Sequence, residues 1–221
     1  MLHYAARVYA IRAKRDAIMN PNASPPMPEI EDLLTWAESQ NPGPWVLHSR
    51  LVGDAARFIA ERTAGLDPDM AQAMGTLHDI GRRYRGTNIR HCLDGYSIMI
   101  AKGYPDIARI CITHSFQIKS LKSYEGKYDI TQEEGIFIED YLAKCVYDEY
   151  DLLIQLCDAL VDGRGYCLIE KRLVDVALRN GIAELMIEKW KKIFELKSHF
   201  EQLVGCSIYS LLPGAIENSV K

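Results

Sequence analysis

The sequence places His78 and Asp79 side by side at the end of an apolar stretch, in the pentapeptide LHDIG. Both side chains are costly to bury, because a charge in a low-dielectric interior must be paired, neutralised or bound to a metal. Other polar side chains interrupt apolar helical faces in the same way, and these are His48, His91, His114 and Asp158. Histidine and aspartate are ligand types shared by zinc, manganese and iron, so the set predicts a divalent-metal site.

Ordinary structure is the competing explanation for each of these residues. A single buried histidine is usually satisfied by a hydrogen bond, and a single buried aspartate usually caps a helix or pairs with arginine. That explanation would have to apply separately on five helices, which favours one shared site. The six cysteines form no C-x-x-C pair, and we predict buried free thiols. The absence of cysteine from the set argues against a structural zinc site.

Periodicity and capping signals predict the helices that position the set. The stripe containing His48 runs through residues 45–64 with the spacing of one helical face. Asp67 is a favourable N-cap for the helix that carries His78, and Gly81 is expected at its C′ position. Later helices are expected from about residue 88, from residue 105, and over 131–144, 150–161, 169–180 and 182–204. Gly95, in the middle of one of them, indicates a close approach by a neighbouring element.

The rest of the chain gives no sign of strands, repeats or low-complexity segments. We therefore predict an all-α, single-domain helical bundle of about eight or nine helices. Residues 1–28 are expected to form an N-terminal helix, over 2–19, and a proline-rich connector. Residues 29–205 would form the helical domain, and residues 206–221 an irregular C-terminal tail.

Composition narrows the possible partners. The chain has 221 residues, 48% of them apolar, and a net charge of −4. This charge gives no general attraction to nucleic acid or to anionic membranes, so neither is expected as a partner. The sequence contains no apolar run long enough to span a bilayer, and its start lacks the features of a signal peptide, which predicts a cytoplasmic protein. The N-terminal segment leaves homo-oligomer formation open.

The order His48, His78-Asp79, Asp158 resembles that of the HD superfamily of metal-dependent phosphohydrolases. The resemblance covers about residues 44–165, and the LHDIG pentapeptide is its most specific part. It implies an HD-type helical domain in which these four residues hold a first metal, with Asp79 as the catalytic ligand. Members with two additional histidines often hold a second metal, a role for which His91 and His114 are in the right order. The candidate ions are Fe, Mn, Zn, Co and Ni.

A basic loop follows the HD pair directly. Arg82, Arg83 and Arg85, together with Lys119, are predicted to bind the phosphate of a small phosphorylated substrate. A bound metal would lower the pKa of water towards neutrality and supply the nucleophile. The function predicted is hydrolysis of a phosphoester of a small molecule or nucleotide. Two alternatives stay open, namely an HD-fold di-iron oxygenase with the same four-His, two-Asp ligand count and a catalytically silent nucleotide-binding module.

Overall fold

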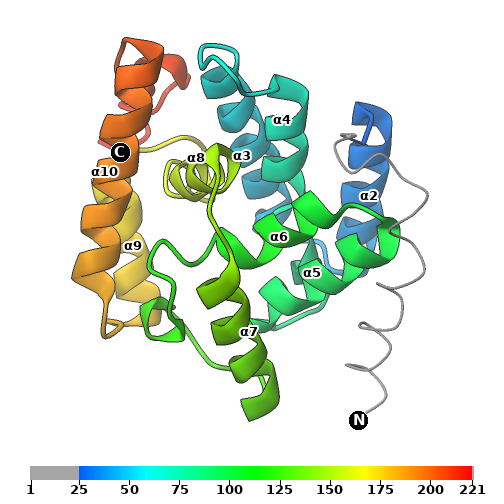
Figure 1. Cartoon of the computed structure of the whole chain (residues 1–221). Coiled ribbons are helices and arrows are strands. Elements are labelled where there is room, and N and C mark those ends of the chain that lie inside the picture. Colours follow the sequence, from blue (N-terminus) through cyan, green and yellow to red (C-terminus); the bar gives the residue numbers. More distant parts are fainter. Residues whose placement is uncertain (1–24, 221) are drawn as a thin grey trace.

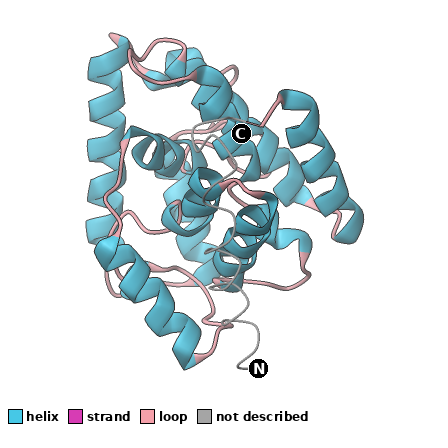
Figure 2. Cartoon of the chain, turned by 45° about the vertical axis from the view of Figure 1, so that its right-hand side comes forward, coloured by secondary structure: helices cyan, strands magenta, loops and turns pink. Residues whose placement is uncertain are grey.

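The computed structural model describes residues 25–220, so the helix predicted over residues 2–19 lies outside the described part. This part contains nine α-helices and three short 3-10 helices, with one isolated bridge between Val161 and Tyr166 and no strand (Figure 2). The α-helices are α2 (Met27–Gln40), α3 (Pro44–Ala60), α4 (Pro68–Leu77), α5 (Arg90–Lys102), α6 (Pro105–Thr113), α7 (Gln132–Lys144), α8 (Glu149–Asp158), α9 (Ile169–Asn180) and α10 (Met186–Val204). The 3-10 helices are η1 (Ile80–Arg83), η2 (Leu121–Ser123) and η3 (Ile208–Leu211). The all-α prediction is confirmed.

Local sequence explains where several helices begin. Proline occupies the first position of α3, α4 and α6, where its missing N–H group costs no helical hydrogen bond. The Asp67 carboxylate caps α4 by accepting from the backbone N–H groups of Asp69, at 2.8 Å, and Met70, at 3.2 Å. Thr131 and Glu134 form the predicted capping box at the start of α7.

The short helix α8 lies at the centre of the molecule and packs against α3, α4, α6 and α10. Figure 1 shows α9 and α10 together on one side of the bundle and α2 on the opposite side. Buried apolar residues from α2 through η3 form one continuous core. The C-terminal segment contributes to it, since Ile208 and Ala215 are buried. No helix in residues 25–220 combines the length and the apolar character needed to cross a bilayer.

Helices α3 and α4 cross at two glycines. A Cβ added to Gly75 would lie 2.7 Å from the Cα and 2.9 Å from the backbone nitrogen of Gly53. A Cβ added to Gly53 would meet the Thr76 hydroxyl at 2.1 Å. Because the obstacle is largely backbone, only glycine permits this approach. The crossing brings together the two helices that carry His48 and His78.

A second glycine contact joins the HD turn to α5. The prediction that Gly81 is the C′ residue of α4 is wrong, because α4 ends at Leu77 and Gly81 lies inside η1. Glycine is needed there for space, since a Cβ would lie 2.0 Å from the carbonyl oxygen of His91 and 2.6 Å from the nitrogen of Gly95. The close approach expected at Gly95 is confirmed, because its own Cβ would meet Cys111 Cβ at 3.0 Å.

The remaining differences from prediction are small. Helix α8 ends at Asp158 rather than at residue 161, and α10 begins at Met186 rather than at residue 182. All six cysteines are free thiols, as predicted. Four of them are buried, but Cys145 is partly exposed and Cys206 is exposed, so burial holds for only part of the set.

Candidate metal centre

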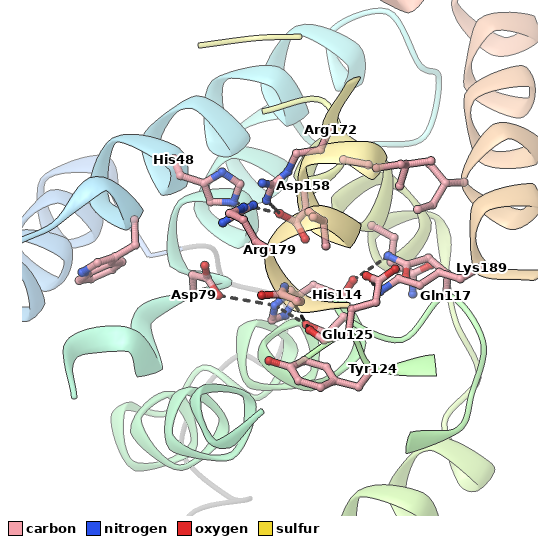
Figure 3. Close-up of a pocket in the computed structure, with 18 of the residues that line it drawn as sticks. His48, Asp79, His114, Gln117, Tyr124, Glu125, Asp158, Arg172, Arg179 and Lys189 are labelled. Carbon is pink, nitrogen blue, oxygen red and sulfur yellow. Dashed lines mark hydrogen bonds and ion pairs between the residues drawn. The ribbon is translucent and has the colours of Figure 1, made fainter. Parts of the chain in front are cut away.

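Five helical elements bring the six predicted ligands to one place. His48 lies in the second turn of α3, and His78 and Asp79 follow the last turn of α4. The other three residues are His91 near the start of α5, His114 immediately after α6, and Asp158 at the end of α8. Figure 3 shows His48, Asp79, His114 and Asp158 around a common pocket. Polar side chains from helix ends thus converge inside the bundle.

Backbone carbonyl groups fix the tautomer of three of the histidines. The Nδ1 of His78 lies 2.6 Å from Gly75 O, and the Nδ1 of His114 lies 3.0 Å from Ile110 O. The Nδ1 of His91 likewise contacts Asn88 O. A carbonyl oxygen can only accept, so each Nδ1 carries the proton and donates it. In the neutral form of each ring, Nε2 is then left with a lone pair directed into the site, as metal-ligating histidines require.

Protein donors lie within reach of two of these atoms, since Ser115 Oγ is 2.9 Å from His114 Nε2 and Arg82 Nη2 is 3.4 Å from His91 Nε2. The Nε2 atoms of His91 and His114 are 3.2 Å apart. Asp79 Oδ1 lies 3.1 Å from His91 Nε2 and 3.6 Å from His114 Nε2. Among the described residues, buried Asp79 Oδ1 and His78 Nε2 have no hydrogen-bond partner. Facing acceptors repel one another in a protein interior, so the donor set fits a bound cation.

The ligand atoms fall into two groups. The donor atoms of His48, His78 and Asp79 lie within 4.8 Å of one another, as do those of His91, Cys92 and His114. The groups adjoin, since the rings of His78 and His114 have centroids 4.9 Å apart. Cys92 is absent from the predicted set. Its position beside His91 is the only feature of the sequence that points to it as a ligand.

Asp158 is the remaining predicted ligand. Its Oδ1 lies 2.9 Å from His48 Nε2, so it adjoins the first group through that histidine. The structure therefore brings all six predicted ligands together, although Asp158 stands at the edge of the cluster. Two such adjacent groups have the donors for one divalent ion and for a second beside it.

Electrostatics gives four of the ligands the protonation states that metals require. Burial lowers the pKa of His78, and it lowers the pKa of His114 to about 3, so both rings are neutral at pH 7. Burial opposes ionisation of Asp79, but Arg82 outweighs it and holds the pKa of this carboxyl well below its usual range. Burial likewise opposes ionisation of Asp158, whose pKa His48 holds well below normal. Burial opposes protonation of His91, but the neighbouring Cys92 and Asp79 raise its pKa to about 10, so a metal would have to displace a proton from this ring.

The pocket in front of these ligands has a volume of about 340 Å³. Two arginines of α9, Arg172 and Arg179, line it. Arg172 Nη2 lies 3.7 Å from Asp158 Oδ1. Burial lowers the pKa of Arg179, and the nearby guanidinium groups of Arg172 and Arg82 lower it further. Arg82 and Arg172 each adjoin a carboxylate of the candidate cluster and Arg179 adds a further positive charge, so this wall is a favourable environment for an anion.

Most of the predicted substrate-binding residues lie elsewhere. Arg82 lines the pocket, with its Nε 2.5 Å from Asp79 Oδ2. Arg83 instead stacks over the Trp36 ring at 4.0 Å, and Arg85 is exposed outside the pocket. Lys119 donates to the Cys145 carbonyl and lies 4.4 Å from the ring centroid of Tyr147. The structure therefore brings only Arg82 of this group to the pocket. Sequence reasoning missed Arg172 and Arg179, because nothing in the sequence shows that α9 approaches the cluster.

Comparison with known proteins gives one match. The family model described as HD domain matches residues 46–161, slightly more than half of the chain. No curated protein matches the chain. No solved structure matches it either. The matched range contains all six predicted ligands and ends before the arginines of α9.

Proposed function

The chain belongs to the HD domain family, and we propose that it is a metal-dependent phosphohydrolase that acts on a phosphoester of a small molecule or nucleotide. One observation carries the proposal, namely that the ligand cluster and three arginines share a single pocket. A cluster without the arginines would suit many metal-dependent reactions. The cationic wall favours a substrate that carries negative charge beside the ligands.

Within this proposal, His48, His78, Asp79 and Asp158 would hold a divalent ion, and His91 and His114 would hold a second. When bound, such an ion supplies a water activated for attack and neutralises charge on the phosphate. Arg82 holds Asp79 by Oδ2, which keeps the carboxylate ionised and leaves Oδ1 directed towards the histidines. This arrangement keeps Asp79 available as a ligand to both groups.

The protein side chains would also position the substrate. The guanidinium groups of Arg172 and Arg179 donate to phosphate oxygens, and their planar geometry suits two parallel hydrogen bonds. The pocket volume of about 340 Å³ is near the lower end of the range for small-molecule sites. The substrate would therefore be a small phosphoester rather than a folded macromolecule.

Phosphate release tests the proposal directly. Protein loaded with Mn²⁺, Co²⁺ or Fe²⁺, with its metal content measured, is expected to release phosphate from at least one ester in a panel of nucleotides, sugar phosphates and aryl phosphate. Absence of release from every ester, by protein shown to hold metal, would contradict a phosphohydrolase.

A matched pair of arginine variants tests the anion-binding wall. Arg179→Gln is expected to raise KM by about tenfold or more, because a hydrogen bond to a charged group contributes about 1.5–3 kcal/mol. Arg62→Gln is the control, since Arg62 is exposed near the end of α3 and outside the pocket. Equal KM values for both variants would show that Arg179 does not contribute to substrate binding.

A di-iron oxygenase is the second candidate, and one observation favours it. Asp79 adjoins both ligand groups, an arrangement suited to two neighbouring metals. Iron-loaded protein would then give a mixed-valent electron paramagnetic signal and consume O₂ with an organic substrate. Phosphate release without O₂ consumption would exclude this function. Tight nucleotide binding with neither activity would indicate a catalytically silent module.

A further inference from the structure

The pocket has a second wall, of a different chemical character from the arginine wall. Gln117, Glu125 and Gln155 line it, and the structure describes each of these side chains as at least nine-tenths buried. In the view of Figure 3, Gln117 and Lys189 lie on one side of His114, and Asp79 lies on the other. This second wall is called the acceptor wall below.

Backbone carbonyls fix the orientation of both glutamine amides. Gln117 Nε2 donates to His114 O at 3.0 Å, and Gln155 Nε2 donates to Thr113 O at 3.0 Å. Because a carbonyl needs a donor, the nitrogen of each amide must face it, and the oxygen must face away. Within residues 25–220, neither buried Oε1 atom receives a hydrogen bond from the protein.

Glu125 adds a third acceptor without adding net charge. Its Oε2 accepts from Lys189 Nζ at 2.9 Å, and the two side chains are only 6% and 10% exposed. The other carboxylate oxygen, Oε1, is buried and has no donor in the described part of the chain. Since Lys189 neutralises Glu125, this wall does not form a second anion site. The three free oxygens have almost no exposed surface of their own, so an uncharged donor that enters the pocket would reach them as these side chains turn towards it.

Resting on the proposed function, we infer that the acceptor wall formed by Gln117, Gln155 and Glu125 recognises hydroxyl or amino groups on the organic part of the phosphoester. The arginines select the phosphate, and the acceptor wall selects what the phosphate is attached to. An apolar organic group would leave three buried acceptors without donors, which disfavours it strongly. Sugar hydroxyls and nucleobase N–H groups are the two sources of this donor chemistry.

A matched series of esters tests the inference. With metal-loaded protein, kcat/KM is measured for ribose 5-phosphate, glucose 6-phosphate, nucleoside 5′-monophosphates, propyl phosphate and phenyl phosphate. We expect at least about a tenfold preference for the esters that carry donors over the last two. A preference limited to sugar phosphates assigns the wall to hydroxyl groups, and one limited to particular nucleotides assigns it to base N–H groups. Equal turnover of all the esters would overturn the inference and leave the hydrolase proposal intact.

The variant Gln117→Leu tests the wall itself. It keeps the approximate size of the side chain and removes the acceptor, so the preference ratio is expected to fall about tenfold. Gln155→Leu is a second test in case the first variant fails to fold. Gln202→Leu, at an exposed position of α10 outside this pocket, is the control and should keep the ratio. An unchanged preference ratio in folded, metal-loaded Gln117→Leu would show that Gln117 does not recognise the organic part of the ester.

Ligand-induced thermal stabilisation separates failure of this inference from failure of the proposed function. The probes are ribose 5-phosphate, adenosine 5′-monophosphate and phenyl phosphate, added to metal-loaded protein. Stronger stabilisation by the first two than by phenyl phosphate, without turnover, would support the acceptor wall while contradicting the hydrolase. Equal stabilisation by all three probes without turnover would overturn both.

Discussion

At the scale of single residues, the partners of the ligands determine the chemistry as much as the ligands themselves. Each of His78, His91 and His114 gives its Nδ1 proton to a carbonyl in its own helix or the turn before it. Arg82 occupies one oxygen of Asp79 and leaves the other facing the rings. These contacts make the donor atoms available to a cation before one binds.

Variants that each remove one ligand are expected to show, by their metal content, which ion that ligand holds. If both groups bind an ion, His91→Ala should lose the second ion and keep the first, whereas His48→Ala should weaken the first. The decrease in metal affinity should be larger than the decrease of about 10–100-fold that follows removal of a residue that only hydrogen-bonds to a ligand. Elemental analysis of dialysed protein measures the stoichiometry.

The matched control for these variants is His199→Ala. His199 lies in α10, contacts Glu149 at the surface and is outside the cluster. Its substitution should leave the metal stoichiometry unchanged. Wild-type stoichiometry in both ligand variants would contradict the assignment of the cluster as a metal centre.

A buried carboxylate after α8 gives a prediction with a defined pH dependence. Asp162 accepts from the backbone nitrogen of Arg164 at 2.7 Å and from Lys171 Nζ at 3.0 Å. Burial opposes its ionisation, but these donors outweigh it and lower its pKa. The stabilisation is therefore complete above the unfolded-state pKa of about 3.9 and is lost as the pH falls through the lowered folded-state value.

Asp162→Asn should accordingly lower the free energy of unfolding by about 1–3 kcal/mol at pH 7. The difference from wild type should shrink as the pH falls below about 4, because the carboxylate takes up a proton first in the unfolded chain and, at lower pH, in the folded one. Urea unfolding at several pH values measures it. Asp140→Asn, at an exposed position of α7, is the control and should change little. A pH-independent difference would show that the charge of Asp162 is not what stabilises the loop.

At the scale of elements, the sequence predicted best what is encoded locally. The N-terminal caps of α4 and α7 follow from residues within three positions of each helix start, and both are observed. Apolar faces interrupted by histidine identified four of the ligand positions, and one interrupted by aspartate identified Asp158, because a polar residue on a buried stripe is visible without any tertiary structure.

Features that depend on tertiary packing could not be predicted from the local sequence. Arg83 follows Arg82 directly, yet it turns towards Trp36 of α2, because adjacent residues of a helical turn point in different directions. The approach of α9 to the pocket depends on tertiary contacts far from it in sequence, so Arg172 and Arg179 carried no local signal. The role of Gly81 was misread for the same reason, since its neighbour is the backbone of α5.

The glycine crossing of α3 and α4 gives a prediction about these two elements. Gly75→Ala should destabilise the protein by about 1–3 kcal/mol, because its methyl group would overlap the backbone of Gly53. Chemical denaturation measures the loss, and the metal content is expected to fall with it.

Gly135→Ala in α7 is the matched control, because its nearest neighbour would lie at an ordinary 3.5 Å. This substitution should stabilise the helix by about 0.5–1 kcal/mol, since alanine is less flexible than glycine in the unfolded chain. Equal effects of the two substitutions would show that the close approach in α3 and α4 has no energetic importance.

At the scale of the whole molecule, the candidate ligands span residues 48–158 and come from elements on several sides of the core. A cation held by such distant positions binds the folded chain and not the unfolded one. Metal binding should therefore stabilise the entire fold rather than one local segment.

Removal of metal tests this coupling. At a free-ion concentration of a hundred times Kd, binding adds about 2.7 kcal/mol of stability, which corresponds to about 5–10 °C in Tm for a domain of this size. Chelator-treated protein should melt lower than reconstituted protein by this amount in a calorimetric scan. His48→Ala should respond less to added metal, and an identical Tm with and without metal in the wild type would contradict the coupling.

The approach of Gly75 to Gly53 is between backbone atoms, which cannot change rotamer as side chains can, so it holds α3 and α4 at one distance of closest approach. His48 precedes one of these glycines by five residues, and His78 follows the other by three. The spacing of the two rings is therefore preorganised by the main chain. Ions that need a larger or more adaptable coordination sphere would have to force the helices apart, so selectivity among metals would come from rigidity as well as from ligand type.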